Sequence, residues 1–182
     1  MPGHAPILDF DGTIARLDLD WEALRYRFAV ARIDDLWGGD PACWDVVTAA
    51  EVEAAGSAMP VGAVMTCLRE VDAFAVLSNN SEAAIAHFMH RFPDVEARLA
   101  LIVGRETLGG PKTDFDRFRR GLADCLAATR PQRSGGPELY FGDAAYELEF
   151  AAELGMVPVD VLELRRRDAA AGALDLEELH QR

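Results

Sequence analysis

Short apolar runs alternate with amphipathic stretches over most of this sequence. Apolar runs that end at a turn-forming residue are typical of buried strands. We expect five strands, at residues 5–10, 73–78, 99–103, 138–141 and 156–161. Apolar residues at helical spacing predict helices at 82–92, 115–126 and 144–154. Strands that alternate with helices predict a parallel sheet covered on both faces, which is a three-layer, Rossmann-like α/β core.

Residues between about 14 and 60 break this alternation, because they hold helical stripes with no strand between them. One stripe runs through Leu17, Trp21, Leu24, Phe28 and Ala31. A second helix is expected at 44–55, and a third at 61–71 leads back into the sheet. We therefore expect a core at 1–14 and 60–165, a small helical cap at 15–59, and a C-terminal tail at 166–182 that adds a terminal helix.

Composition and charge exclude several classes of protein. The formal net charge is −13 and the pI is near 4.6, which argues against nucleic-acid binding, since the run Arg165-Arg166-Arg167 is the one basic cluster. No apolar stretch reaches the roughly 18 residues of a membrane helix, and no secretory pattern opens the chain, so a cytoplasmic location without a membrane partner is expected. Cys43, Cys67 and Cys125 are odd in number and far apart, which favours reduced thiols over disulfides or a zinc site.

Chemically active side chains follow the predicted strands at the points where these strands end. Asp9 ends the first strand, Ser78 the second, and Asp143 follows the fourth, while Lys112 lies in the loop after the third. Ligands of parallel α/β sheets bind at the carboxyl ends of the strands. We therefore expect these four residues to meet at one edge of the sheet.

The segment from Asp9 to Thr13 reads Asp-Phe-Asp-Gly-Thr and places two carboxylates two residues apart. Asp9 and Asp11 could bind a cation there, although an Asp-Gly turn at a strand end would explain the same pattern. Ser78 could hold a phosphate oxygen together with the backbone N–H of Asn79, or it could cap the following helix. Both readings of Ser78 are compatible with each other.

Lys112 is the only lysine among 18 Lys and Arg residues, which favours a position where a compact point charge is needed. Chance placement on a solvated loop is the alternative. Asp143 and Glu147 are four residues apart on one face of the predicted helix, so both could face the site. The alternatives are a helix N-cap for Asp143 and an exposed surface acid for Glu147.

In this order, the four segments resemble the four motifs of the haloacid dehalogenase-like (HAD) superfamily hydrolases. The first motif is matched by Asp9 to Thr13, the second by Ser78, the third by Lys112, and the fourth by Gly142-Asp143 with Glu147. The resemblance spans roughly residues 7–161. The place of the helical insertion, between the first and second motifs, is similar to that in the phosphoglycolate phosphatase-like subfamily.

This resemblance implies a magnesium-dependent phosphatase. Asp9 would attack phosphorus to give an aspartyl-phosphate, while Asp11 would protonate the leaving oxygen and then activate water. Ser78, Asn79 and Lys112 would bind the phosphate. Mg²⁺ would be held by Asp9, Asp143, Asp11 through its backbone carbonyl, and Glu147 directly or through water. Asp11 also distinguishes phosphatases from dehalogenases, which carry another residue at that place.

Two residues depart from the commonest pattern of the family. Glu147 stands where Asp is usual, and Ala144 stands where a small hydroxyl residue is frequent. Two other functions stay open at this point. One is a phosphotransferase or sugar-phosphate mutase of the same fold, and the other is a binding module without turnover.

The short cap predicts a site that is only partly covered. Arg25 and Arg32 lie seven residues apart on one helical face, and are either surface arginines or contacts for an anionic substrate. Trp37 and Trp44 flank a Gly-Gly-Asp-Pro turn, and either pack cap helices together or cover the site. The expected partner is a small phosphorylated metabolite, such as a sugar phosphate, a phosphoglycolate-like acid or a nucleotide. The chain could act as a monomer or a homodimer.

Overall fold

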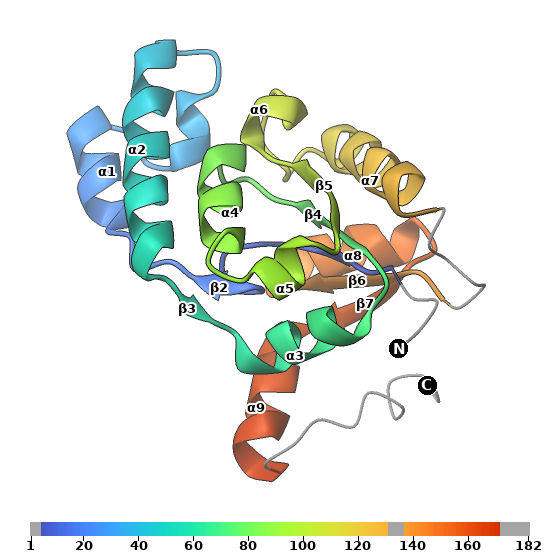
Figure 1. Ribbon diagram of the computed structural model, residues 1–182. Helices are drawn as coiled ribbons and strands as arrows, with labels where there is room; N and C mark the ends of the chain where they lie inside the picture. Colours follow the sequence, from blue (N-terminus) through green and yellow to red (C-terminus); the bar gives the residue numbers. More distant parts are fainter. Residues whose placement is uncertain (1–4, 131–136, 172–182) are drawn as a thin grey trace.

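A five-stranded parallel sheet forms the centre of the molecule (Figure 1). The computed structural model describes residues 5–130 and 137–171, with side chains up to Arg166. The strands lie in the order β5 (Leu99–Val103), β4 (Phe74–Leu77), β1 (Ile7–Leu8), β6 (Leu139–Gly142) and β7 (Val157–Asp160). Ile7 of the central strand is paired with Ala75 on one side and Tyr140 on the other. The predicted α/β core is confirmed.

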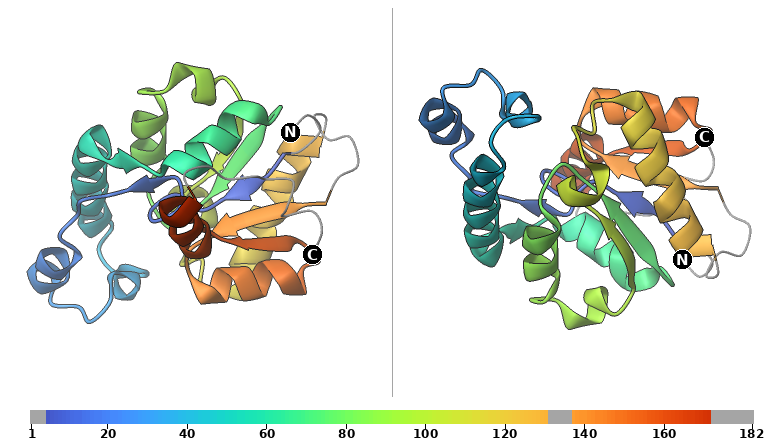
Figure 2. Two further views of the ribbon diagram at one scale, coloured as in Figure 1. Left: turned by 90° about the horizontal axis from the view of Figure 1, so that it is seen from below. Right: turned by 90° about the horizontal axis from the view of Figure 1, so that it is seen from above.

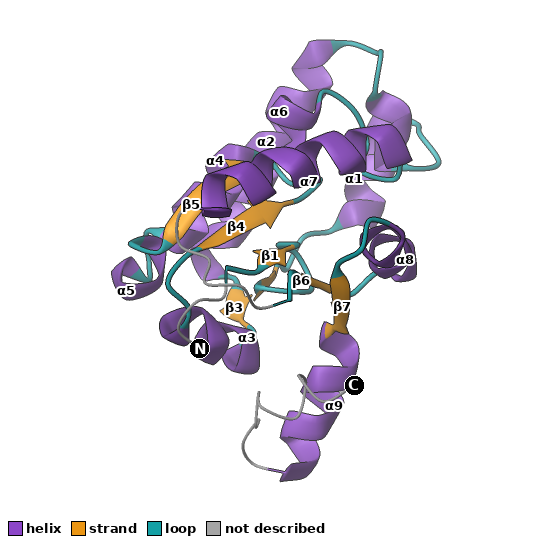
Figure 3. Cartoon of the chain, turned by 90° about the vertical axis from the view of Figure 1, so that its right-hand side faces the viewer, coloured by secondary structure: helices purple, strands orange, loops and turns teal. Residues whose placement is uncertain are grey.

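Helices cover both faces of this sheet (Figure 3). One face packs against α3 (Gly62–Glu70), α4 (Glu82–Met89), α5 (Pro93–Glu96) and α9 (Val161–Ala171). The other face packs against α7 (Phe115–Thr129) and α8 (Ala145–Glu153). Successive side chains of a strand point to opposite faces, so Leu8 belongs to the first core and Ile7 to the second. The result is the three-layer arrangement predicted from the alternating pattern.

The predicted cap is a helical insertion beside the core (Figure 2). Its neck is an antiparallel ribbon of β2 (Ala15–Arg16) and β3 (Met59–Pro60). Between these strands lie α1 (Trp21–Phe28), the 3₁₀ helix η1 (Ile33–Leu36) and α2 (Pro41–Ser57), and α2 packs along α4 of the core. The ribbon was not predicted, because two residues on each side are too few to show a strand pattern.

Several element ends differ from the prediction for local reasons. The helix predicted at 44–55 starts at Pro41, because Asp40 caps it by accepting a hydrogen bond from the Ala42 N–H. The helix expected at 82–92 stops at Met89, and Phe92 instead caps the short α5. The fifth strand ends at Asp160, one residue earlier than predicted, because α9 begins at Val161.

A further helix, α6 (Arg105–Leu108), was missed, since it is a single turn. Gly155 has φ +83° just after α8, as expected for a helix C-terminus. The loop expected at 131–137 and the end of the C-terminal tail lie largely outside the described residues. None of the helices described here is long and apolar enough to cross a membrane.

Candidate active site

The predicted site residues come together in one cavity of about 450 Å³ between the strand ends and the cap, open to solvent on one side. The core contributes the residues predicted to act in catalysis or to bind phosphate or metal, namely Asp9, Asp11, Ser78, Asn79, Lys112, Asp143 and Glu147. The parallel topology explains this meeting, because Asp9, Ser78 and Asp143 follow neighbouring strands. A solvent-connected cavity agrees with the expectation for a short cap.

Asp9 and Lys112 form a buried ion pair that lines the cavity. The Nζ atom of Lys112 lies 2.5 Å from Oδ1 of Asp9, and the lysine side chain is only 1% exposed. Lys112 Nζ also donates to the carbonyl oxygen of Leu77 at 3.1 Å. Burial by itself would lower the pKa of Lys112, but the charges of Asp9 and Glu147 outweigh burial and raise it. Lys112 is therefore a fixed positive charge beside the Asp9 carboxylate.

Glu147 holds Lys112 from the other side. Its Oε1 atom lies 2.9 Å from Lys112 Nζ, and its Oε2 atom accepts a hydrogen bond of 3.0 Å from the Tyr140 hydroxyl. Burial, followed by the charge of Asp9, raises the pKa of Glu147 to about 7. The alternative of an exposed surface acid is wrong, because Glu147 is buried. Its role as a metal ligand stays a prediction.

The turn after β1 fixes the direction of Asp11. The Leu17 N–H donates to Asp11 Oδ1 at 2.9 Å, and the Gly12 N–H donates to the Ala15 carbonyl at 2.7 Å. Gly12 has φ +82°, a backbone conformation that favours glycine. Burial, and then the neighbouring charges of Asp9 and Asp143, raise the pKa of Asp11 to about 6, although the Leu17 N–H opposes this rise. Asp11 can thus carry a proton near neutral pH.

Asp143 approaches this turn closely. A Cβ atom at Gly12 would lie 2.0 Å from Asp143 Oδ2, so glycine is needed for space as well as for its dihedral angle. Burial and the charge of Asp9 raise the pKa of Asp143. Asp143 is not the N-cap of α8, because Ala144 occupies that position without a side-chain hydrogen bond. The capping alternative for Asp143 is wrong.

The side chains around Asp9 fit a magnesium ion chemically. Asp9, Asp11 and Asp143 offer carboxylate oxygens, which Mg²⁺ prefers, and line the same cavity. The charge of Asp9 raises the pKa of both Asp11 and Asp143, and a bound cation would relieve this repulsion. Within the described part of the chain, no three His, Cys, Asp or Glu side chains are already gathered as a metal site. Magnesium binding therefore remains a prediction supported by the donor chemistry.

Ser78 and Asn79 form one wall of the cavity. The Ser78 hydroxyl donates to Asn80 Oδ1 at 3.1 Å and accepts from the Asn80 N–H at 3.3 Å. Asn79 Oδ1 accepts a hydrogen bond of 2.7 Å from the Lys112 N–H. The cap of α4 is Ser81, whose Oγ accepts from the Ala84 N–H, and so Ser78 does not cap this helix.

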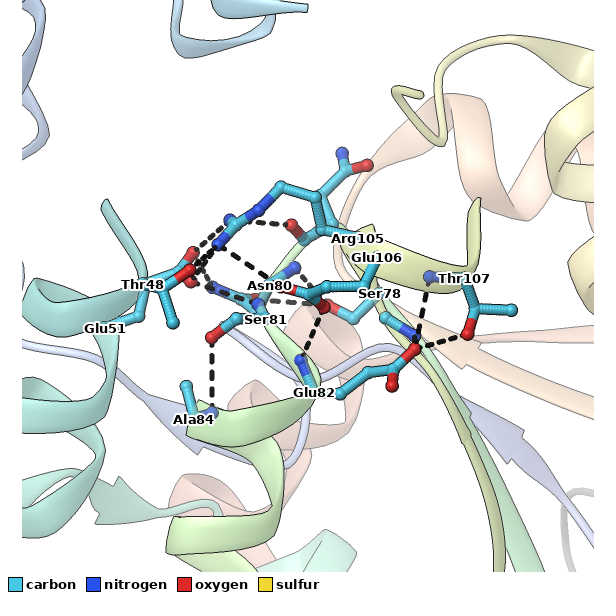
Figure 4. Close-up of polar contacts among 12 residues, drawn as sticks. Thr48, Glu51, Ser78, Asn80, Ser81, Glu82, Ala84, Arg105, Glu106 and Thr107 are labelled. Carbon is cyan, nitrogen blue, oxygen red and sulfur yellow. Dashed lines mark hydrogen bonds and ion pairs between the residues drawn. The ribbon is translucent and has the colours of Figure 1, made fainter. Parts of the chain in front are cut away.

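A buried pair, Glu51 and Arg105, was not predicted and connects the cap to this wall (Figure 4). Glu51 lies on α2 and accepts two hydrogen bonds of 3.0 Å from Arg105. The same carboxylate also accepts a hydrogen bond of 3.1 Å from the Asn80 side-chain amide and one of 3.0 Å from the Ser81 N–H. Since Asn80 donates to Glu51 through its amide nitrogen, its amide oxygen faces Ser78. The cap thus sets the orientation of the loop that carries Ser78.

Glu51 had a signal in the sequence. It shares the buried face of α2 with Val47, Ala54 and Ala55, and an acid within such an apolar stripe needs a partner. Nothing comparable marks Arg105, because its short helix follows a strand without any helical periodicity.

The cap contributes arginine and tryptophan side chains to the cavity. Arg25 and Arg32 both line it, and Arg32 is also paired with Asp34 at 3.0 Å. The rings of Trp37 and Trp44 have centroids 4.7 Å apart at 45°. These two tryptophans therefore pack against each other and also line the cavity.

Comparison with known proteins identifies the fold. No protein-family model matches the sequence, and no curated protein matches it significantly. Solved structures do match. A HAD-superfamily hydrolase from Ehrlichia chaffeensis has 14% identity and a TM-score of 0.52, covering 91% of this chain and 96% of that one.

Two further structures extend the comparison. A HAD family enzyme from Bacteroides thetaiotaomicron, in complex with magnesium and inorganic phosphate, has 13% identity and a TM-score of 0.57, covering 86% of this chain and 93% of that one. The L-2-haloacid dehalogenase from Xanthobacter autotrophicus, with chloropropionic acid covalently bound, has 13% identity and a TM-score of 0.54. The match covers 98% of this chain and 87% of that one. The chain therefore has the fold of the HAD-superfamily hydrolases.

Proposed function

We propose that this protein is a magnesium-dependent phosphatase that hydrolyses a small phosphate monoester through an aspartyl-phosphate on Asp9. The observation that carries the proposal is the buried pair of Asp9 and Lys112 at the carboxyl edge of the sheet. A carboxylate held beside a fixed ammonium, with Asp11 in the same cavity, is suited to nucleophilic displacement at phosphorus.

In the first step, a carboxylate oxygen of Asp9 forms a bond to phosphorus while the bond from phosphorus to the ester oxygen breaks. Asp11 gives its proton to the departing oxygen, and Lys112 offsets negative charge on the phosphoryl group. In the second step, water attacks phosphorus, Asp11 takes the proton, and Asp9 is released. Magnesium held by Asp9, Asp143 and the Asp11 carbonyl would add positive charge at the phosphoryl oxygens.

Asp11 is the feature that favours phosphate esters over organic halides. An alkoxide leaving group needs a proton, whereas a halide leaves without one. The turn from Gly12 to Leu17 fixes the Asp11 carboxyl beside the nucleophile. We therefore propose phosphatase rather than dehalogenase chemistry on this fold.

Ser78 and Asn79 would bind oxygen atoms of the phosphoryl group while Asp9 receives it. Ser78 lines the cavity, and its hydroxyl would turn from Asn80 toward a phosphate oxygen when one is bound. Lys112 links this wall to the nucleophile, because its N–H is bonded to Asn79 and its Nζ to Asp9.

Phosphate release from a panel of phosphorylated metabolites tests the proposal. We expect turnover that requires Mg²⁺ and disappears in Asp9→Asn and Asp11→Asn. Asp45→Asn is the matched control, because Asp45 is an exposed acid on α2 that does not line the cavity. Full turnover in Asp9→Asn would refute the proposed nucleophile. Phosphate transfer to an added sugar without release to water would replace hydrolysis by phosphotransfer.

A further inference from the structure

All three tryptophans of the 182-residue chain line the cavity that holds Asp9. They come from three different elements of the cap. Trp21 begins α1, Trp37 follows η1, and Trp44 lies in α2. Three indole rings from the cap, here called the tryptophan wall, therefore line the same cavity as the proposed nucleophile.

These tryptophans are not part of a hydrophobic core. Among the described residues, the two core clusters contain none of them, and each is only partly buried. Large aromatic side chains usually contribute most of their energy when fully buried. Indole surface left open inside a cavity is instead available to a ligand.

Two of the three tryptophans, Trp37 and Trp44, are held in place before any ligand binds. The guanidinium group of Arg105 lies 4.4 Å from the ring centroid of Trp44, and the ring of Trp37 packs against that of Trp44. Arg105 is fixed by Glu51 and by a 2.7 Å hydrogen bond to Thr48 Oγ1. Such preorganisation lowers the entropy lost on binding.

The volume and the charged side chains of the cavity restrict the range of possible substrates further. Its volume of about 450 Å³ lies within the range of roughly 300–1,000 Å³ that is typical of small-molecule pockets. A two- or three-carbon phosphate would contact only part of this lining. Arg25 and Arg32 both line the cavity, and Arg32 is paired there with Asp34 at 3.0 Å, so Arg25 supplies the positive charge that the cap adds. An anionic ligand with a flat apolar part fits both properties.

We propose that the substrate is a phosphate monoester whose leaving group carries a planar aromatic ring, and that this ring stacks on the tryptophan wall. This inference rests on the proposed phosphatase function. The ring could belong to a nucleobase or to another aromatic alcohol, since both offer the same stacking surface.

Ligand binding to the inactive Asp9→Asn variant tests the ring separately from turnover. All indole fluorescence of the protein originates in the cavity, so stacking should quench it directly. We expect adenosine monophosphate and phenyl phosphate to quench this fluorescence, and ribose phosphate and glycerol phosphate to do so much less. Isothermal titration calorimetry should give dissociation constants about tenfold lower for the ring-bearing compounds. Tighter binding of adenosine monophosphate than of phenyl phosphate would assign the ring to a nucleobase.

Two substitutions locate the contact. Trp21→Leu and Trp37→Leu, each made in Asp9→Asn, should weaken binding of the ring-bearing compounds about tenfold and leave ribose phosphate within about twofold. Tyr26→Leu is the control, because Tyr26 is an aromatic residue on α1 that is 89% exposed and does not line the cavity. Equal losses for ring-bearing and ring-free compounds would overturn the inference.

The outcomes for substrate and function can be told apart. If the native protein releases phosphate from ribose phosphate as efficiently as from adenosine monophosphate and phenyl phosphate, the aromatic inference fails while the phosphatase stands. If the ring-bearing compounds bind as expected but no compound is hydrolysed with Mg²⁺, the phosphatase proposal fails while the aromatic site stands.

Discussion

Replacing Arg105 by Met should destabilise the protein strongly, because it leaves a buried carboxylate without its counter-charge. Glu51 is 1% exposed and Arg105 is 4% exposed, so water cannot replace the lost partner (Figure 4). The substitution removes both hydrogen bonds to Glu51, the one to Thr48, and the stacking on Trp44. Breaking a buried pair by deleting one partner costs about 3–5 kcal/mol.

We expect a loss near the lower end of that range, about 3 kcal/mol, because Glu51 keeps the N–H donors of Asn80 and Ser81. In a chain of this size, that corresponds to roughly 10 °C in Tm. Urea denaturation followed by circular dichroism would measure the free energy of unfolding. Arg105→Lys keeps the charge but loses the planar guanidinium group. Its free energy of unfolding should lie between those of the native protein and Arg105→Met.

A second variant and a surface control make the reasoning refutable. Glu51→Gln/Arg105→Met removes both charges of this pair, so about 1–2 kcal/mol of the lost stability should return. Arg119→Met removes an exposed pair with Asp116, whose side chains are 57% and 74% exposed, and should cost less than about 1 kcal/mol. If Arg105→Met costs no more than Arg119→Met, the cap is not anchored by this pair.

Three shorter predictions concern the site itself. Gly12→Ala should abolish phosphate release, because its Cβ would collide with Asp143. Gly38→Ala is the control, since Gly38 also has a positive φ, +84°, but has open space around it. This control should stay active and lose only about 1–3 kcal/mol of stability through backbone strain, as measured by urea denaturation. Equal activity of the two variants would contradict the close approach. Lys112→Met should lower kcat by about 100-fold or more in steady-state assays, and an unchanged kcat would exclude this lysine from catalysis. Ser81→Ala should lower the free energy of unfolding by about 1 kcal/mol through loss of the helix cap, and no change would contradict its capping role.

The sequence was most informative where local pattern and tertiary structure agree. The third strand was predicted with its observed bounds, because Leu99–Val103 is a continuous apolar run. Asp9, Ser78 and Asp143 could be placed together because a parallel sheet brings their strand ends to one edge. In contrast, the pairing of Glu51 with Arg105 joins residues 54 positions apart, and no periodicity of either segment reports such a contact.

The position of Glu147 illustrates a second limit of the sequence. The sequence predicted Glu147 beside the metal, but its contacts with Lys112 and Tyr140 depend on how far α8 is rotated over the sheet. The same pattern of acids at one helix face therefore allows a metal ligand or a lysine partner. Which contacts Glu147 makes depends on side-chain packing, and the spacing of residues in the sequence does not determine that packing.

The ribbon at the neck of the cap has a consequence for protein engineering. Ala15 is paired with Pro60, so the insertion leaves and re-enters the core at neighbouring positions. Insertions with adjacent ends are readily exchanged, because the host chain keeps its own connections. A cap from another protein could therefore be grafted at this neck to change which esters are accepted. The graft would have to carry an acid in place of Glu51, or Arg105 would lose the buried carboxylate that pairs with it.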